Sequence, residues 1–68
     1  MHYTAIIKQD GDWWIGWVGE VSGVNAQEKS KAELISSLRG LLMEALEFNR
    51  AEARFAAEAN YTEELLSI

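Results

Sequence analysis

The chain has 68 residues, the size of one small domain, which leaves no room for a second. It has no cysteine and one histidine, so it contains no disulfide and offers no obvious thiolate or zinc site. A net charge of −5 disfavours nucleic-acid binding, because phosphates attract basic proteins. Domains this small bury little surface, and the 49% hydrophobic content supplies apolar contacts, so we expect a homodimer or larger assembly.

No segment is typical of a signal peptide, and no apolar run approaches the roughly 20 residues that a membrane helix needs. Together with the lack of cysteine, this favours a cytoplasmic protein without membrane contact. The excess of acidic residues suits a basic partner, although the same charges also serve simply to keep a small protein soluble.

Two strand-like segments flank a turn signal near the N-terminus. Residues 2–8 are rich in β-branched and aromatic types, and residues 13–18 read Trp-Trp-Ile-Gly-Trp-Val. Asp10-Gly11 between them predicts a hairpin with a type I′ turn. Gly16 in the middle of the second strand indicates that a neighbouring element approaches closely there.

A third, weaker strand is predicted at residues 24–27, after a glycine-bounded turn at 19–23, and it completes an antiparallel meander. Ser30 and Glu33 then form a capping-box pattern at the start of a helix. Apolar residues follow at helical spacing. They are Leu34, Ile35, Leu38, Leu41, Leu42, Ala45 and Leu46.

The helix is predicted to run from Lys31 to about Ala57, a length of roughly 40 Å at 1.5 Å per residue. The strands span only about 20 Å. The helix therefore extends beyond its own sheet, and its far end needs support from a dimer mate or a partner protein. Gly40 is expected to mark another close approach, on the outer side of the helix.

The C-terminal tail begins after Asn60, which we expect to end the helix in a left-handed conformation. Residues 64–68, Glu-Leu-Leu-Ser-Ile, fit either a short fourth strand, with Leu66 and Ile68 on one face, or a frayed turn. The whole of residues 1–68 is expected to form a single α+β domain.

The order of these elements resembles that of the HicB-like antitoxin family, the partner components of bacterial HicA–HicB toxin–antitoxin systems. The residues that carry the resemblance lie between positions 2 and 50. They are Tyr3 to Ile7, Asp10-Gly11-Asp12-Trp13-Trp14, Glu20 to Val24, Ser30-Lys31-Ala32-Glu33-Leu34, and the helical segment Leu41 to Phe48.

The resemblance implies a partial ribonuclease-H-like fold, with three antiparallel strands, a helix packed on one face and a fourth strand after the helix. It also implies neutralisation of a small, basic, RNA-cleaving HicA-like toxin by coverage of its surface. Many family members carry a C-terminal DNA-binding domain, and the eight residues after Asn60 are too few for one. Direct nucleic-acid binding is therefore not expected, and an orphan homo-oligomeric domain without a toxin is the alternative.

Catalysis is not expected. Nuclease chemistry on a ribonuclease-H-like core needs clustered carboxylates that hold metal ions, whereas Asp10 and Asp12 flank a tight turn and are expected to be solvated. Glu63 and Glu64 form a similar solvated pair, and His2 has no evident nucleophile partner. We predict no catalytic residue, no metal site and no cofactor.

Tryptophans on both faces of the second strand indicate an interface. Strand alternation places Trp13 and Trp17 on one side and Trp14 on the other, and a single helix covers only one side. Stacking on single-stranded RNA bases is disfavoured, because only Lys8 is near the rings. The predicted partner or oligomer interface consists of Trp13, Trp14, Trp17, Phe48 and Phe55.

Overall fold

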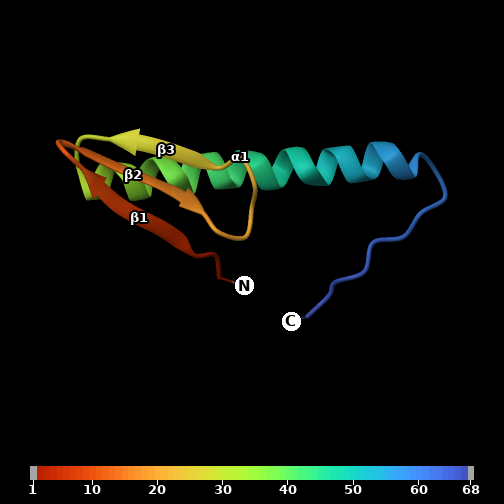
Figure 1. The fold of residues 1–68 in the computed structure, drawn as a ribbon. Helices are drawn as coiled ribbons and strands as arrows, with labels where there is room; N and C mark the ends of the chain where they lie inside the picture. The colour runs from red at the N-terminus through yellow and green to blue at the C-terminus, as the bar shows by residue number, and fades with distance from the viewer. Residues whose placement is uncertain (1, 68) are drawn as a thin grey trace.

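A computed structural model describes residues 2–67 of the chain as a three-stranded antiparallel sheet and one long helix (Figure 1). The strands are β1 (Ala5–Asp10), β2 (Trp13–Val18) and β3 (Asn25–Glu28), in the spatial order β1-β2-β3, and the helix is α1 (Lys31–Ala57). The α+β architecture predicted from the sequence, a meander with a helix on one face, is confirmed.

The β1–β2 hairpin differs from the prediction in its turn and in its start. Asp10 pairs with Trp13, so the two-residue loop is Gly11-Asp12. Only Gly11 of these two has a positive φ, +62°, which fits a type II′ turn rather than the predicted type I′ turn. β1 begins at Ala5 instead of residue 2, because Thr4 bonds to the turn after β2 through both its carbonyl and its amide.

The helix packs on the sheet face that carries Trp14 and Val18, and Gly16 lets it come close. A Cβ at position 16 would lie 2.8 Å from the backbone oxygen of Ile6 and 3.2 Å from methyl carbons of Leu34 and Leu38. The close approach predicted at Gly16 is therefore confirmed. The buried core is small. It consists of Val18, Val24, Leu34 and Leu38.

The first turn of α1 is capped by Ser30, whose Oγ accepts a 3.2 Å hydrogen bond from the Glu33 amide, as predicted. The reciprocal bond from the Ser30 amide to the Glu33 side chain is absent from the described structure, so half of the capping box forms. One turn further, the Ser37 hydroxyl donates a 2.6 Å bond to Glu28 Oε2 and ties the helix to the end of β3.

The helix runs from Lys31 to Ala57, as predicted, but Glu58 rather than Asn60 terminates it. Glu58 follows the last helical residue with φ 63°, and its amide donates to the carbonyls of Arg54 and Phe55, at 3.2 Å each. Asn60 does adopt the predicted left-handed backbone, with φ 63°, but it lies in the segment after the helix. The chain has already left the helical path at Glu58, because a positive φ cannot continue a right-handed helix.

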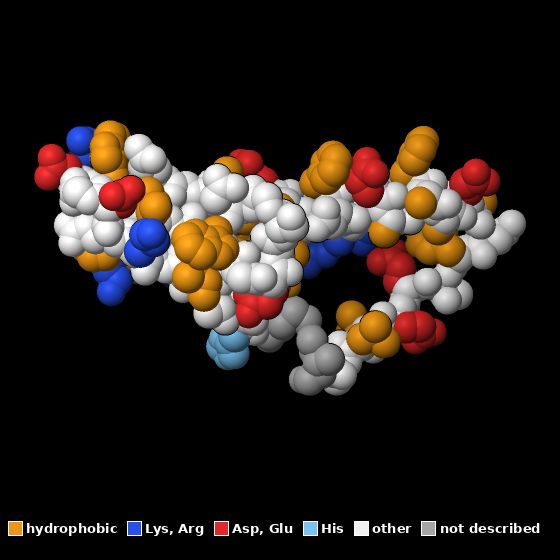
Figure 2. Space-filling model, viewed as in Figure 1, with side chains coloured by type: hydrophobic (Ala, Val, Ile, Leu, Met, Phe, Trp, Pro, Cys, Tyr) orange, Lys and Arg blue, Asp and Glu red, His pale blue; other side chains and the backbone are white. Residues whose placement is uncertain are grey.

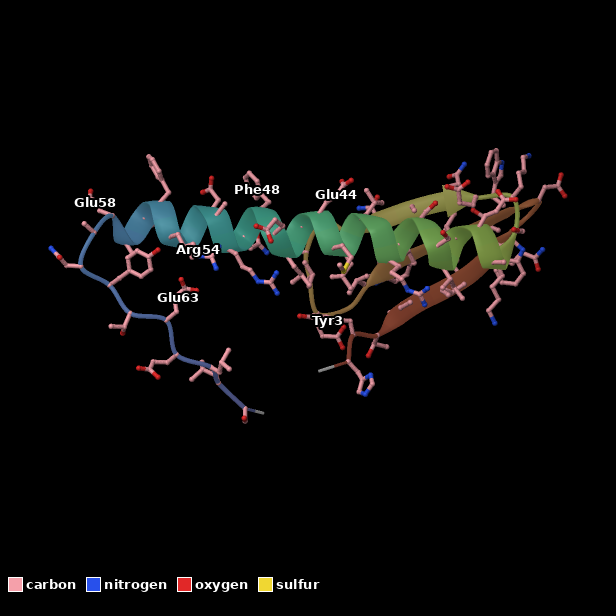
Figure 3. All side chains as sticks on the ribbon, turned by 180° about the vertical axis from the view of Figure 1, so that it is seen from behind. Tyr3, Glu44, Phe48, Arg54, Glu58 and Glu63 are labelled. Atoms are coloured by element: carbon pink, nitrogen blue, oxygen red, sulfur yellow. The ribbon has the colours of Figure 1, made fainter. Side chains whose placement is uncertain are left out.

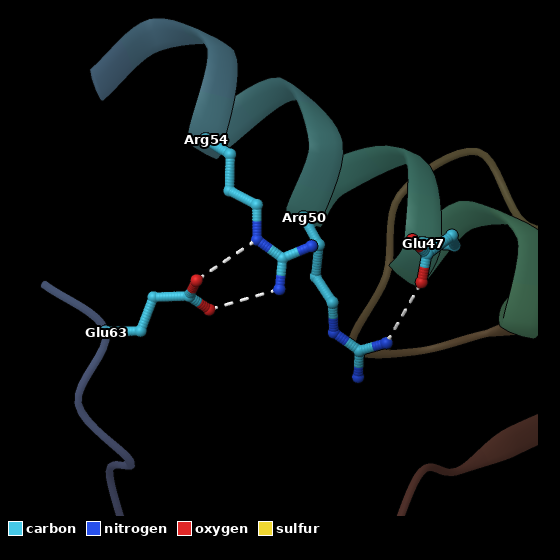
Figure 4. Close-up of polar contacts among 4 residues, drawn as sticks. All are labelled: Glu47, Arg50, Arg54 and Glu63. Carbon is cyan, nitrogen blue, oxygen red and sulfur yellow. Dashed lines mark hydrogen bonds and ion pairs between the residues drawn. The ribbon is translucent and has the colours of Figure 1, made fainter. Parts of the chain in front are cut away.

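The fourth strand predicted at residues 64–68 is not confirmed, because residues 58–67 contain no strand and Ile68 lies outside the described residues. The tail turns back beneath the far end of the helix (Figure 1). Arg54 holds it there through two hydrogen bonds to the Glu63 carboxylate, 3.3 Å from Nε and 3.1 Å from Nη2 (Figure 4). A strand needs a neighbouring strand for its backbone hydrogen bonds, and the described tail has none beside it, since it lies below the overhanging part of α1 (Figure 1).

The C-terminal part of α1 extends beyond the sheet, as the element lengths predict (Figure 1). Every residue from 47 to 67 is exposed. The molecule measures 52 × 23 × 15 Å, with a radius of gyration of 15.2 Å. A compact domain of this length has a radius of gyration near 11 Å, so the overhang makes the chain much more extended than a typical small domain.

Candidate protein-binding surfaces

The sheet face opposite the helix carries a row of apolar side chains. Trp13, Ile15 and Trp17 alternate along β2 on this outer face, and Ile6 of β1 lies directly across from Trp17. Trp13 is 39% exposed and Trp17 is 42% exposed. As strand alternation predicts, Trp13 and Trp17 share one face, and the structure shows that the helix covers the opposite face.

Charged residues surround this outer face. Lys29 Nζ lies 3.9 Å from the ring centroid of Trp13, a cation–π contact. Lys8 pairs across the sheet with Ile15, and Asp10 pairs with Trp13. Two lysines, Lys8 and Lys29, therefore lie near the rings, whereas the sequence predicted only Lys8. Asp10 beside Trp13 still disfavours binding of an RNA phosphate backbone to this face.

Trp14 occupies a different environment from the other two tryptophans. It lies half-buried on the inner face and packs against the core cluster. It is also paired across the sheet with Gln9 and Glu28. Of the predicted interface residues, Trp14 therefore contributes to the core, while Trp13 and Trp17 are about two-fifths exposed and Phe48 and Phe55 are mostly exposed.

The overhanging helix carries the other two predicted aromatics. Phe48 is 64% exposed and Phe55 is 86% exposed. They are seven residues apart, and Leu41, seven residues before Phe48, is also exposed, although the sequence pattern assigned it to the core stripe. Seven residues are nearly two helical turns, so the three side chains form one stripe along α1. The structure thus separates Phe48 and Phe55 from the tryptophans, on a second surface.

A groove lies where this stripe meets the sheet. Its volume is about 590 Å³, and the loop after β2 forms one wall through Gly23 and Val24. Leu41, Ala45 and Phe48 of α1 form most of the opposite wall, with Glu44 at its side. This groove connects the covered core to the overhanging helix.

A second, smaller groove of about 310 Å³ lies between the N-terminal segment and α1. Its walls are largely apolar, from Val18, Leu38 and Leu42, with His2 and Arg39 also lining it. Sequence reasoning identified neither groove, because each one forms between segments that are distant along the chain.

Gly40 does not make the predicted close contact. Nothing in the described structure lies within 4 Å of the position that a Cβ would take there. The glycine leaves an open patch on the helix surface.

The acidic residues are dispersed. Among residues 2–67, no three His, Asp or Glu side chains gather closely enough to hold a metal ion. Glu63 is paired with Arg54, and this pairing raises the pKa of the guanidinium. Glu20 accepts a 2.8 Å bond from the Thr4 amide, which lowers the pKa of the Glu20 carboxyl. The Arg54–Glu63 pair links α1 to the tail, and the Thr4–Glu20 bond links the N-terminal segment to the turn after β2.

Within the described residues, α1 lacks the continuous apolar length required to cross a bilayer. Comparisons with protein-family models, with curated proteins and with solved structures found no match to this chain.

Proposed function

We propose that this chain is an antitoxin-like protein-binding module that neutralises a small RNA-cleaving toxin by covering the toxin's surface. One observation carries the proposal. The described chain exposes 5707 Å². A compact monomer of 7.7 kDa exposes about 4,300 Å², so this chain carries a large excess of accessible surface. An excess that includes Trp17, Phe48 and Phe55 fits a protein that completes its burial against a partner.

The class of partner is suggested by the HicB-like order of elements together with charge. The net charge of −5 favours encounter with a basic protein and opposes encounter with nucleic acid. An RNA-cleaving toxin has to bind anionic RNA and therefore presents a basic surface. Occlusion of that surface by an acidic module requires no catalytic residue on the module.

The test is co-expression with the short basic reading frame that the proposal places beside this one. Expression of that neighbour alone should arrest growth, and co-expression of this chain should restore growth and yield a complex that co-purifies. A neighbour that is not toxic, or a toxic neighbour that stays toxic and separate, would contradict the proposal.

A second candidate function, a homo-oligomeric domain without a toxin, is favoured by the outer sheet face. Trp13 and Trp17 on that face are each about two-fifths exposed, and no other described element covers them. The solution mass over a dilution series separates the candidates. A mass of one chain at micromolar concentration, with both tryptophans quenched by iodide, would rule out self-association through this face.

A further inference from the structure

Aromatic and acidic side chains alternate along one side of the overhanging helix. Figure 2 shows hydrophobic and acidic side chains taking turns along the upper edge of this part of α1. Figure 3 shows Glu44, Phe48 and Glu58 on that side and Arg54 on the opposite side. Steps of three or four residues separate the helical members of the row, so they share one face of α1, and Glu58, the residue after the helix, lies on the same side (Figure 3). We call this face the ridge. It consists of Glu44, Phe48, Glu52, Phe55 and Glu58.

The negative charge of the ridge is not neutralised within the chain. The two arginines of the overhang are engaged elsewhere, Arg50 with Glu47 at 3.5 Å and Arg54 with Glu63 at 3.1 Å (Figure 4). Among residues 2–67, the three ridge glutamates form no ion pair. The ridge thus combines two exposed rings with three uncompensated carboxylates.

The groove of about 590 Å³ opens at the sheet end of the ridge, with Phe48 and Glu44 in its wall. The residues that contribute most to binding at an interface typically sit in pockets from which the partner excludes water. A partner that lies along the ridge would place one apolar side chain in this groove. Its next apolar side chain would meet Phe55, about 10 Å further along the helix.

A second copy of this chain is a poor occupant of the ridge. Antiparallel pairing about Phe48 places Leu41 opposite Phe55 of the other copy, but it also places Glu44 opposite Glu52. Parallel pairing places each glutamate opposite its own counterpart. Both arrangements bring like charges together, which opposes association. Anionic lipid surfaces and nucleic acids are opposed for the same reason.

We infer that the ridge binds a cationic amphipathic helix of another protein, with apolar residues seven positions apart and lysine or arginine beside them. The apolar residues contact Phe48 and Phe55, and the basic residues pair with Glu44, Glu52 and Glu58. This inference rests on the proposed protein-binding function and names the surface and the chemistry of the partner. Helix-in-groove recognition of this kind depends on apolar anchors spaced along one face.

The test uses a fluorescent synthetic helix of about 18 residues, or five turns, with leucine at heptad positions and lysine at the flanking positions. A peptide of the same composition with scrambled leucine positions tests the apolar spacing, and a version with glutamate in place of lysine tests the charge. We expect the scrambled peptide to bind at least tenfold more weakly and the acidic peptide not to bind detectably. Equal binding of the leucine–lysine helix and the scrambled peptide would overturn the inference.

Variants of the chain place the binding on the ridge. Phe48→Ser and Phe55→Ser should each weaken binding of the leucine–lysine helix about tenfold or more. Glu44→Gln with Glu52→Gln should weaken it several-fold and flatten its dependence on salt. Met43→Ser is the matched control, since Met43 is also exposed but lies about 140° around the helix from Phe48, and it should bind as the unaltered chain does. Circular dichroism should show that all variants remain folded.

Several results would contradict the inference. One is that Phe48→Ser and Met43→Ser bind the leucine–lysine helix equally well. Another is that the solution mass of the chain falls in Phe48→Ser, which would show that a second copy occupies the ridge. The third is that the chain binds anionic vesicles more strongly than it binds the peptide. The proposed function fails separately. If the chain forms a complex with the neighbouring basic protein and Phe48→Ser does not weaken that complex, the proposed function stands and the ridge is not its site. If the peptide binds the ridge but no such complex forms, the ridge stands as a binding surface and the proposed function is wrong.

Discussion

Leu38 packs against Gly16 so closely that its Cδ1 atom lies 3.2 Å from the position of a Cβ on residue 16. The backbone oxygen of Ile6 is closer still, at 2.8 Å, and cannot rotate away. The contact sets how near α1 comes to the sheet, because a glycine presents no side chain to hold them apart.

Gly16→Ala should therefore destabilise the domain, by about 1–3 kcal/mol, since overpacking a tight core forces neighbours to shift. Gly40→Ala is the matched control, because the position of its Cβ is open. That change should raise stability by about 0.5–1 kcal/mol, the usual gain from alanine in a helix. Urea unfolding measures both, and a shift of the same sign in the two variants would contradict the packing described.

The Ser30 cap should contribute to the stability of the whole domain. Ser30→Ala removes the acceptor of the Glu33 amide and should cost about 1 kcal/mol. Ser36→Ala, in an exposed position inside the same helix, should instead be neutral or stabilise by up to about 0.5 kcal/mol. Urea unfolding of the two variants compares them, and equal effects would show that the cap contributes nothing.

Glu20 should make stability depend on pH in the acid range. The Thr4 amide lowers the pKa of the Glu20 carboxyl in the folded chain below the ordinary value of 4.5. A lowered pKa stabilises the fold at pH values above the ordinary pKa, and the contribution is lost as pH falls through the folded pKa. Glu20→Gln should thus be less stable than the unaltered chain near neutral pH, and the difference should shrink below pH 4.5. A difference that stays constant over that range would contradict this role.

The Arg54–Glu63 pair should hold the tail without stabilising the core. Both side chains are exposed, and exposed ion pairs contribute little to global stability. Glu63→Gln should leave the urea midpoint unchanged but increase the fast backbone motion of residues 61–67, measured by NMR relaxation. High salt should reproduce the effect in the unaltered chain. Tail dynamics identical in the two proteins would contradict the contact.

Local sequence signals predicted the parts of the fold that depend on neighbouring residues. The hairpin between the first two strands, the Ser30 cap and the helix length all follow from short-range chemistry, and the strand alternation at Trp13 and Trp14 correctly separated the two faces. The turn type was wrong, because it depends on which residue pair closes the hairpin. The terminating residue was wrong, because Glu58 rather than Asn60 leaves the helical path, and a positive φ is unusual for glutamate.

The candidate surfaces were only partly predictable, because some of them form between segments that are distant along the chain. Phe48 and Phe55 were expected at an interface, and the successive spacings of seven from Leu41 to Phe48 and from Phe48 to Phe55 were present in the sequence as a further signal of a shared stripe. The groove beside Phe48 was not predictable, because its walls come from the loop at Gly23 and Val24 and from α1, which are distant along the chain. The fourth strand depends on long-range pairing, and the described tail lies near Arg54 instead.

The most direct test of the central claim is an inhibition titration. RNA cleavage by the basic toxin that we propose as the partner of this chain should be measured against rising concentrations of the chain. We predict that cleavage falls to background at a fixed molar ratio and that Phe48→Ser requires at least tenfold more protein for the same effect. Undiminished cleavage in the presence of a tenfold excess of the folded chain would contradict its function as an antitoxin-like binding module.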